Sequence, residues 1–257
     1  MKVYLDMQLW TYIKDDEITR DFFLSQRSER DCKYYLSVAH LEELFNNEMT
    51  APKEKMGTVQ ELKDLMRSYA EPDVISPKYE DRGLTLDSFR NAETRVRNCD
   101  TREPVKDISK FGFECCKKNG IDPANLFHGI KESEKDAYKK VWEIEIVKNL
   151  SYALLDKRIT CYDKLKNNYL DLEYVISTLF GILSTAGFKR EKTEKKNVSG
   201  QYDIQHAICS TYCDMFITSD QRFADKYKAV AYKMQIPIDI KVYDYKNKVF
   251  KSEEKVY

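Results

Sequence analysis

Short apolar segments alternate with helical patterns at both ends of the chain, and this alternation constrains the fold more than any other feature. Residues 2–5 are apolar and β-prone, and the apolar residues after them recur at helical spacing. Residues 34–36 are also apolar and are also followed by a helical pattern, which Ser37 can cap. Residues 73–75 form a third short predicted strand. Such units predict a parallel sheet whose strands are joined by helices.

The C-terminal part of the chain shows the same alternation. A long helix is predicted over residues 162–186 and a shorter one over 203–212. A strand over 215–218, a helix over 223–233 and a final strand over 236–242 follow. We therefore expect one α/β sheet that combines strands from opposite ends of the chain.

The middle of the chain differs from both ends. It is highly charged, has helical periodicity and shows no strand alternation, over segments such as 86–96, 105–118 and 132–155. We therefore expect a discontinuous core, made of residues 1–77 and 160–257, with a largely α-helical insertion or cap at residues 78–159.

Composition excludes several classes of protein. The 43 basic and 43 acidic side chains leave no overall basic excess, which a general nucleic-acid coat would show, so any such contact must come from local patches. The apolar runs are far shorter than the ~20 residues that span a bilayer, and Asp6 interrupts the N-terminal one, so no membrane span or secretory signal is expected. The seven cysteines form no repeated CxxC pair, which favours reduced thiols in a cytoplasmic protein.

Acidic residues stand where a parallel sheet binds ligands. Asp6 directly follows the first predicted strand, and Asp220 follows the strand that ends at Thr218. Ligands bind outside the carboxyl ends of such strands. Glu43 and Asp203 lie in the first turns of predicted helices, from which side chains can reach the same edge. Each acid taken singly is well explained as a cap or turn residue, so the inference depends on all four together.

Four converging carboxylates need a cation between them. At ~4 Å, each pair of like charges repels by roughly 4 kcal/mol at an effective dielectric constant of about 20. Ligand sets made only of oxygen suit Mg²⁺ or Mn²⁺, which favour chemistry at phosphate groups. The sequence therefore predicts a metal site for Mg²⁺ or Mn²⁺ at this edge of the sheet.

Three segments resemble, in order, the sequence signatures of the PIN-domain nucleases. They are VYLD at residues 3–6, SVAHLEEL at residues 37–44 and YDIQHAICSTYCDMFITSDQRF at residues 202–223. The resemblance covers roughly residues 1–77 and 160–245. It implies a PIN-like, Rossmann-type parallel sheet flanked by helices, with an acidic cluster that binds Mg²⁺ or Mn²⁺.

The resemblance also implies an activity and its residues. It implies a metal-dependent endonuclease that hydrolyses single-stranded RNA, less often DNA, and leaves a 5′-phosphate and a 3′-hydroxyl. Glu42 competes with Glu43 as a ligand, and the spacing from Ser37 favours Glu43. Carried over by position, the metal ligands are Asp6, Glu43, Asp203 and Asp220, and Thr218 lies near the metal.

A basic run precedes Asp203 by a few residues. Lys189, Arg190, Lys195 and Lys196 are predicted to contact substrate phosphates, although charged runs of this kind are commonly solvated loops.

Other functions stay open. A PIN-like sheet can also be a catalytically silent binding or assembly module, with the charged helices of the insertion as a surface for a regulatory partner or a second copy of the chain. A metal-dependent phosphatase of small phosphoesters would use the same acids.

Two histidines suggest a further alternative. His40 lies three residues before Glu43, and His206 three residues after Asp203, so each pair shares one helical face. Carboxylate and histidine pairs on helices build di-iron centres, but those normally place Glu before His and leave no role for Asp6. We expect both histidines to be core residues or supports of the acidic ligands.

Overall fold

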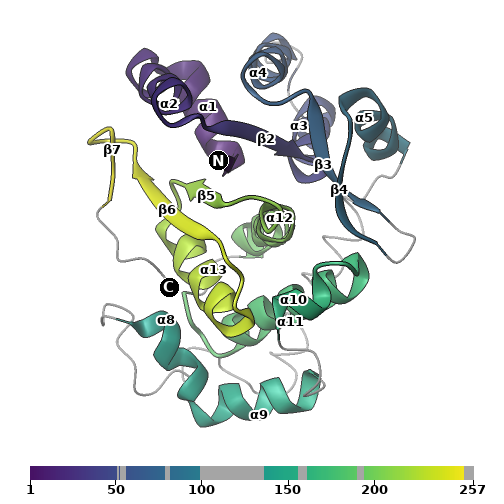
Figure 1. Cartoon of the computed structure of the whole chain (residues 1–257), viewed down its shortest axis with the longest axis vertical. Coiled ribbons are helices and arrows are strands. Elements are labelled where there is room, and N and C mark those ends of the chain that lie inside the picture. Colours follow the sequence, from purple (N-terminus) through teal and green to yellow (C-terminus); the bar gives the residue numbers. More distant parts are fainter. Residues whose placement is uncertain are drawn as a thin grey trace.

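The computed structural model describes residues 1–50, 52, 56–78, 82–98, 136–155, 161–189 and 194–251. Within these residues, seven strands form one sheet in the order β4-β3-β2-β1-β5-β6-β7. All neighbouring strands are parallel except at the two edges, where β4 and β7 pair antiparallel with β3 and β6. Helices cover the sheet on both sides (Figure 1). The predicted α/β class is confirmed.

The N-terminal half builds one side of the sheet. Its strands are β1 (Lys2–Leu5), β2 (Lys33–Ser37), β3 (Asp73–Lys78) and β4 (Arg82–Ser88). Its helices are α1 (Met7–Asp15), α2 (Glu17–Arg30), α3 (Val38–Thr50), α4 (Met56–Tyr69) and α5 (Phe89–Asn98). The strand predicted at residues 2–5 is confirmed, and those predicted at 34–36 and 73–75 are present and longer.

The C-terminal half builds the other side. Its elements are α12 (Glu194–Ser210), β5 (Met215–Thr218), α13 (Gln221–Met234), β6 (Asp239–Asp244) and β7 (Val249–Phe250). The strand predicted at 215–218 is confirmed. The last predicted strand starts later than expected because the chain first closes the end of α13. There Gln235 takes a left-handed conformation, and the Ile236 N–H donates to the Ala231 carbonyl.

The core lies on both faces of the sheet. In β1, Tyr4 packs with α11 (Tyr169–Thr185), α12 and α13 on one face, while Val3 and Leu5 pack with α1, α2 and α4 on the other (Figure 1). A central parallel strand is buried on both faces, which is why β1 is a continuous apolar run rather than an alternating one.

The expectation that no strand lies between residues 78 and 159 is wrong. Residues 82–88 form β4, which pairs with β3 through contacts such as Ile75 with Leu86, and α5 begins only at Phe89. Leu84 and Leu86 do alternate with polar residues, but this signal is short beside the helical pattern that follows. Pairing is favoured because it satisfies the backbone groups of β3, which would otherwise be a sheet edge.

The helix predicted over residues 162–186 is broken in two. α10 (Tyr162–Leu165) ends before Asn168, whose side chain caps α11 by accepting from the Asp171 N–H at 3.2 Å. The turn between the two helices lies against β4, since the backbone of Lys166 approaches Gly83 closely. The break therefore depends on a contact between segments that are distant in sequence.

The C-terminal part of the predicted insertion, residues 136–155, packs against the core. It forms α8 (Ala137–Lys140), the 3-10 turn η2 (Val141–Glu143) and α9 (Glu145–Leu154) in place of one continuous helix. Trp142 is buried, and its indole N–H donates to the Ala229 carbonyl of α13 at 2.9 Å. The helix predicted at 105–118 lies outside the described residues. The division into a core and an insertion at 78–159 stays a prediction.

Of the helices in the described ranges, none has the length and hydrophobicity that crossing a membrane requires.

Candidate functional site

The strand order reverses beside β1, and this reversal defines the candidate site. From β1 the chain moves outward through β2 and β3, and it later returns to place β5 on the other side of β1. Open α/β sheets bind ligands at such a point, outside the carboxyl ends of the two strands. Asp6 follows β1 there, and Thr218 ends β5.

Thr218 joins the two strand ends. Its hydroxyl donates to Asp6 Oδ2 at 2.6 Å and accepts from the Asp220 backbone N–H at 3.0 Å. The Asp6 N–H in turn donates to the Ile217 carbonyl at 2.9 Å. Asp6 and Thr218 are both buried, so this bond holds the carboxylate of Asp6 in one orientation.

Asp220 caps α13. Its Oδ1 accepts from the backbone N–H groups of Arg222 at 2.7 Å and of Phe223 at 3.1 Å. The side chain is exposed. Capping a helix is the role that an aspartate at this position has without any metal. Both capping bonds end on Oδ1, and neither uses Oδ2.

Glu43 lies on α3 and reaches toward α12. Its Oε1 accepts a hydrogen bond from His206 Nε2 at 2.6 Å. Glu42 has a different environment, in which burial and the nearby Glu173 raise its pKa to about 7. Of these two glutamates, Glu43 is the one whose negative charge raises the pKa values of Asp6 and Asp203. The structure therefore favours Glu43 over Glu42 as a member of the site.

Asp203 occupies the middle of a helix, so its predicted place in a first turn is wrong. α12 begins at Glu194 and continues through residues 197–200, although Asn, Val, Ser and Gly at these positions have low helix propensity. Burial raises the pKa of Asp203 well above its usual range, and repulsion from Asp6 raises it further. Glu43 and Asp220 add to this repulsion, which attraction to His206 offsets in part.

The four predicted acids thus form one electrostatically coupled group, the acidic cluster of Asp6, Glu43, Asp203 and Asp220. Burial likewise raises the pKa of Asp6. Across the described ranges, however, no three or more His, Cys, Asp or Glu side chains are arranged so that they could hold a metal ion. Carboxylate oxygens are the ligands that Mg²⁺ and Mn²⁺ take, so the cluster fits these ions in chemistry, while ligation would require some of its side chains to turn toward the others.

Comparison with known proteins supplies no family. No protein-family model, curated protein or solved structure matches this chain.

Tyr4 is a site residue that the sequence analysis missed. Its hydroxyl lies 2.6 Å from His206 Nδ1 and 2.6 Å from Ser37 Oγ, and all three side chains are buried. A signal was present in the sequence, because a tyrosine in a buried strand needs a partner for its hydroxyl. Burial opposes protonation of His206, but the bond to Glu43 and the negative charges of Glu43, Asp6 and Asp203 together outweigh it, so the pKa of His206 is raised.

His40 has a structural role. Its Nδ1 accepts from the Ser37 N–H at 3.0 Å, and its Nε2 donates to the Leu5 carbonyl at 2.8 Å. Burial lowers the pKa of His40 well below its usual range, which keeps the ring neutral. With both ring nitrogens bonded to the backbone, His40 is not placed as a ligand, and the di-iron alternative loses one of its four groups.

Only part of the predicted basic run can be placed. Lys189 pairs with Asp225 at 2.8 Å, and its side chain is 14% exposed. Arg190 lies outside the described residues, and so do the side chains of Lys195 and Lys196, whose backbone belongs to α12. Phosphate contact by these residues stays a prediction, and for Lys189 it would require the pair with Asp225 to open.

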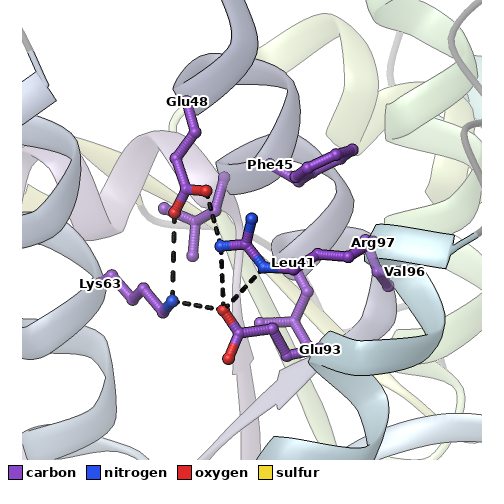
Figure 2. A pocket seen from close by; sticks show the side chains of 8 residues that line it. Leu41, Phe45, Glu48, Lys63, Glu93, Val96 and Arg97 are labelled. Carbon is purple, nitrogen blue, oxygen red and sulfur yellow. Dashed lines mark hydrogen bonds and ion pairs between the residues drawn. The ribbon is translucent and has the colours of Figure 1, made fainter.

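A different polar cluster joins α3, α4 and α5 around a small pocket (Figure 2). Lys63 pairs with Glu48 and Glu93, and Arg97 contacts Glu48 at 2.6 Å and Glu93 at 3.2 Å. Each of these two bases contacts both acids, and the apolar side chains of Leu41, Leu44, Phe45 and Val96 complete the lining. This arrangement fastens three helices together, and its balanced charge does not favour an anionic substrate.

Proposed function

We propose that this protein is a metal-dependent endonuclease that hydrolyses phosphodiester bonds of single-stranded RNA, as do the PIN-domain nucleases that its motifs resemble. The supporting observation is the raised pKa of Asp203, which results from burial and from repulsion by Asp6, Glu43 and Asp220. Such mutual repulsion is unfavourable in the metal-free protein, and the attraction of each carboxylate to a cation bound between the acids would offset it.

The residues divide between holding the ion and orienting its ligands. Asp6, Asp203 and Asp220 would hold the metal, and Glu43 would hold it or position the attacking water. Thr218 keeps Asp6 oriented through its hydrogen bond. A divalent cation bound there would neutralise the charge that develops on the phosphate in the transition state. Attack by water needs no covalent intermediate, and the resemblance implies a 5′-phosphate and a 3′-hydroxyl as products.

Chelation tests this proposal directly. We expect EDTA to abolish cleavage of a fluorescently labelled single-stranded RNA and added Mn²⁺ to restore it, because the acidic cluster without a cation repels the phosphate. The measurement is the initial cleavage rate, with a small aryl phosphate assayed in parallel. Undiminished RNA cleavage after complete chelation would contradict the mechanism. Turnover of the aryl phosphate alone would favour a phosphatase, and metal-independent RNA binding without turnover would favour a binding module.

The basic run is tested through salt dependence. Replacing Arg190, Lys195 and Lys196 by Ala should weaken RNA binding for all sequences alike, because phosphate contacts carry no sequence information. The slope of log Kd against log salt should shrink by about 0.7 for each phosphate of the single strand that the variant no longer neutralises. Binding is measured in EDTA so that no cleavage occurs, with Lys164→Ala on α10 and Lys166→Ala just after it as the control. A slope equal to that of wild type would leave the run a solvated segment.

A further inference from the structure

A chain of buried hydrogen bonds ends at Glu43. It runs from Ser37 Oγ to the Tyr4 hydroxyl, from there to His206 Nδ1, and from His206 Nε2 to Glu43 Oε1, with each step at 2.6 Å. Ser37, Tyr4 and His206 are 0% exposed, whereas Glu43 is 25% exposed. The chain of bonds links β2 and β1 to α12 and α3, so it joins strands from the N-terminal half to a helix from the C-terminal half.

The direction of the last bond follows from the groups involved. A carboxylate oxygen only accepts, so His206 Nε2 must carry the hydrogen that it donates to Glu43. The Tyr4 hydroxyl can donate to or accept from the other ring nitrogen, and Ser37 can satisfy its remaining capacity. The imidazole ring is therefore held from both sides. Tyr4 also packs edge-on against it, with ring centroids 5.7 Å apart.

Glu43 needs such a support more than Asp6 and Asp220 do. Thr218 holds Asp6, and the first backbone N–H groups of α13 hold Asp220. Glu43 has a longer side chain on a helix surface, where several rotamers are open to it. Its bond to His206 selects the rotamer in which its charge acts on Asp6 and Asp203.

We propose that His206, held by Tyr4, is a positioning residue that fixes the Glu43 carboxylate beside Asp6 and Asp203 and so strengthens divalent cation binding by the acidic cluster. This inference rests on the proposed metal site. Hydrogen-bond partners behind metal ligands typically change metal affinity by about 10- to 100-fold when they are removed. His206 acts through Glu43 and is given no contact with the ion or the RNA.

The test compares two buried tyrosines. Tyr4→Phe removes the hydroxyl that holds His206 on α12. Tyr227→Phe removes an equally buried hydroxyl, which bonds to Ser210 and to the Ala207 carbonyl, also on α12. The measurement is the Kd for Mn²⁺ without RNA, from the electron paramagnetic resonance signal of the free ion. We expect Tyr4→Phe to raise the Kd about 10-fold and Tyr227→Phe to leave it within about twofold of wild type.

Two substitutions of His206 separate positioning from simple packing. Gln can place an amide N–H where Nε2 lies, and Asn cannot, so His206→Gln should keep most of the Mn²⁺ affinity while His206→Asn loses about 10-fold or more. Melting curves establish that each variant is folded. Wild-type affinity in folded Tyr4→Phe, or an equal loss in Tyr227→Phe, would overturn the inference. A wild-type protein that binds no Mn²⁺ would instead overturn the proposed function itself.

Discussion

Asp203→Asn is expected to lower the turnover of single-stranded RNA by at least ~100-fold and, in the same protein, to raise the melting temperature of the metal-free form. The loss of turnover follows from removing a carboxylate that helps to hold the cation at the developing charge. The gain in stability follows from removing a charge that is half-buried and repelled by Asp6, Glu43 and Asp220. Substitution of a residue whose role is only structural would not combine a loss of turnover with a gain in stability.

The stability effect has a defined pH dependence. A carboxyl group whose pKa is raised on folding binds its proton more tightly in the folded state, so stability falls as pH rises from the unfolded pKa through the folded pKa. Asp203→Asn removes this contribution. The metal-free variant should therefore melt above wild type near neutral pH, and the difference should vanish in acid, below the usual pKa of an aspartate.

The measurements are single-turnover cleavage rates with Mn²⁺ and melting curves with EDTA or Mn²⁺. Mn²⁺ should stabilise wild type more than Asp203→Asn, since a ligand stabilises the folded state in proportion to its affinity. Asp214→Asn is the matched control. Asp214 lies at the amino ends of β1 and β5, opposite the strand ends that Asp6 and Asp220 follow, and its Oδ2 accepts from the Lys2 N–H at 2.7 Å. Near-normal turnover in folded Asp203→Asn would move the active site elsewhere.

Gly83→Ala is expected to destabilise the protein by about 3 kcal/mol. A Cβ atom at this position would overlap with the Lys166 carbonyl oxygen and would lie 2.9 Å from the carbonyl carbon. Both are backbone atoms of the turn between α10 and α11, so no side-chain rotation relieves the overlap. Either β4 or the turn must shift, and both pack on the core.

Gly181→Ala supplies the matched control with the opposite sign. Gly181 lies within α11, and a Cβ atom there would meet nothing within 4 Å. Replacing a helical glycine by alanine reduces the backbone entropy lost on folding, so we expect stabilisation by up to about 1 kcal/mol. Chemical denaturation of both variants measures the two effects. Equal stability of Gly83→Ala and wild type would contradict the close approach of β4 to the turn.

The sequence predicted the parallel part of the sheet well because its signals are local. The strand at 215–218 has its predicted bounds, and β1 likewise, since each run has the length of a strand and contains β-prone residues. The edge strand β4 and the broken helix after residue 165 were mispredicted. Each depends on a partner distant in sequence, β3 for the strand and Gly83 for the break.

The candidate site was predictable in its acids and not in their support. Asp6 and Asp220 follow strands, so their place at the carboxyl edge follows from local pattern and the geometry of parallel sheets. The contact of Glu43 with His206 joins residues 163 positions apart, and that of Tyr4 with His206 joins residues 202 apart. No periodicity reports such pairs, because side-chain contacts between distant segments leave no repeating pattern.

The sequence by itself determined the class of the fold, the strands that meet at its centre and the acids that end them, because hydrophobic periodicity and strand ends are properties of neighbouring residues. Tertiary structure alone decided where Asp203 sits along its helix, how the acids act on one another's pKa values and which side chains hold the carboxylates. These depend on desolvation and on Coulomb interactions, which act through space between segments that only the folded chain brings together.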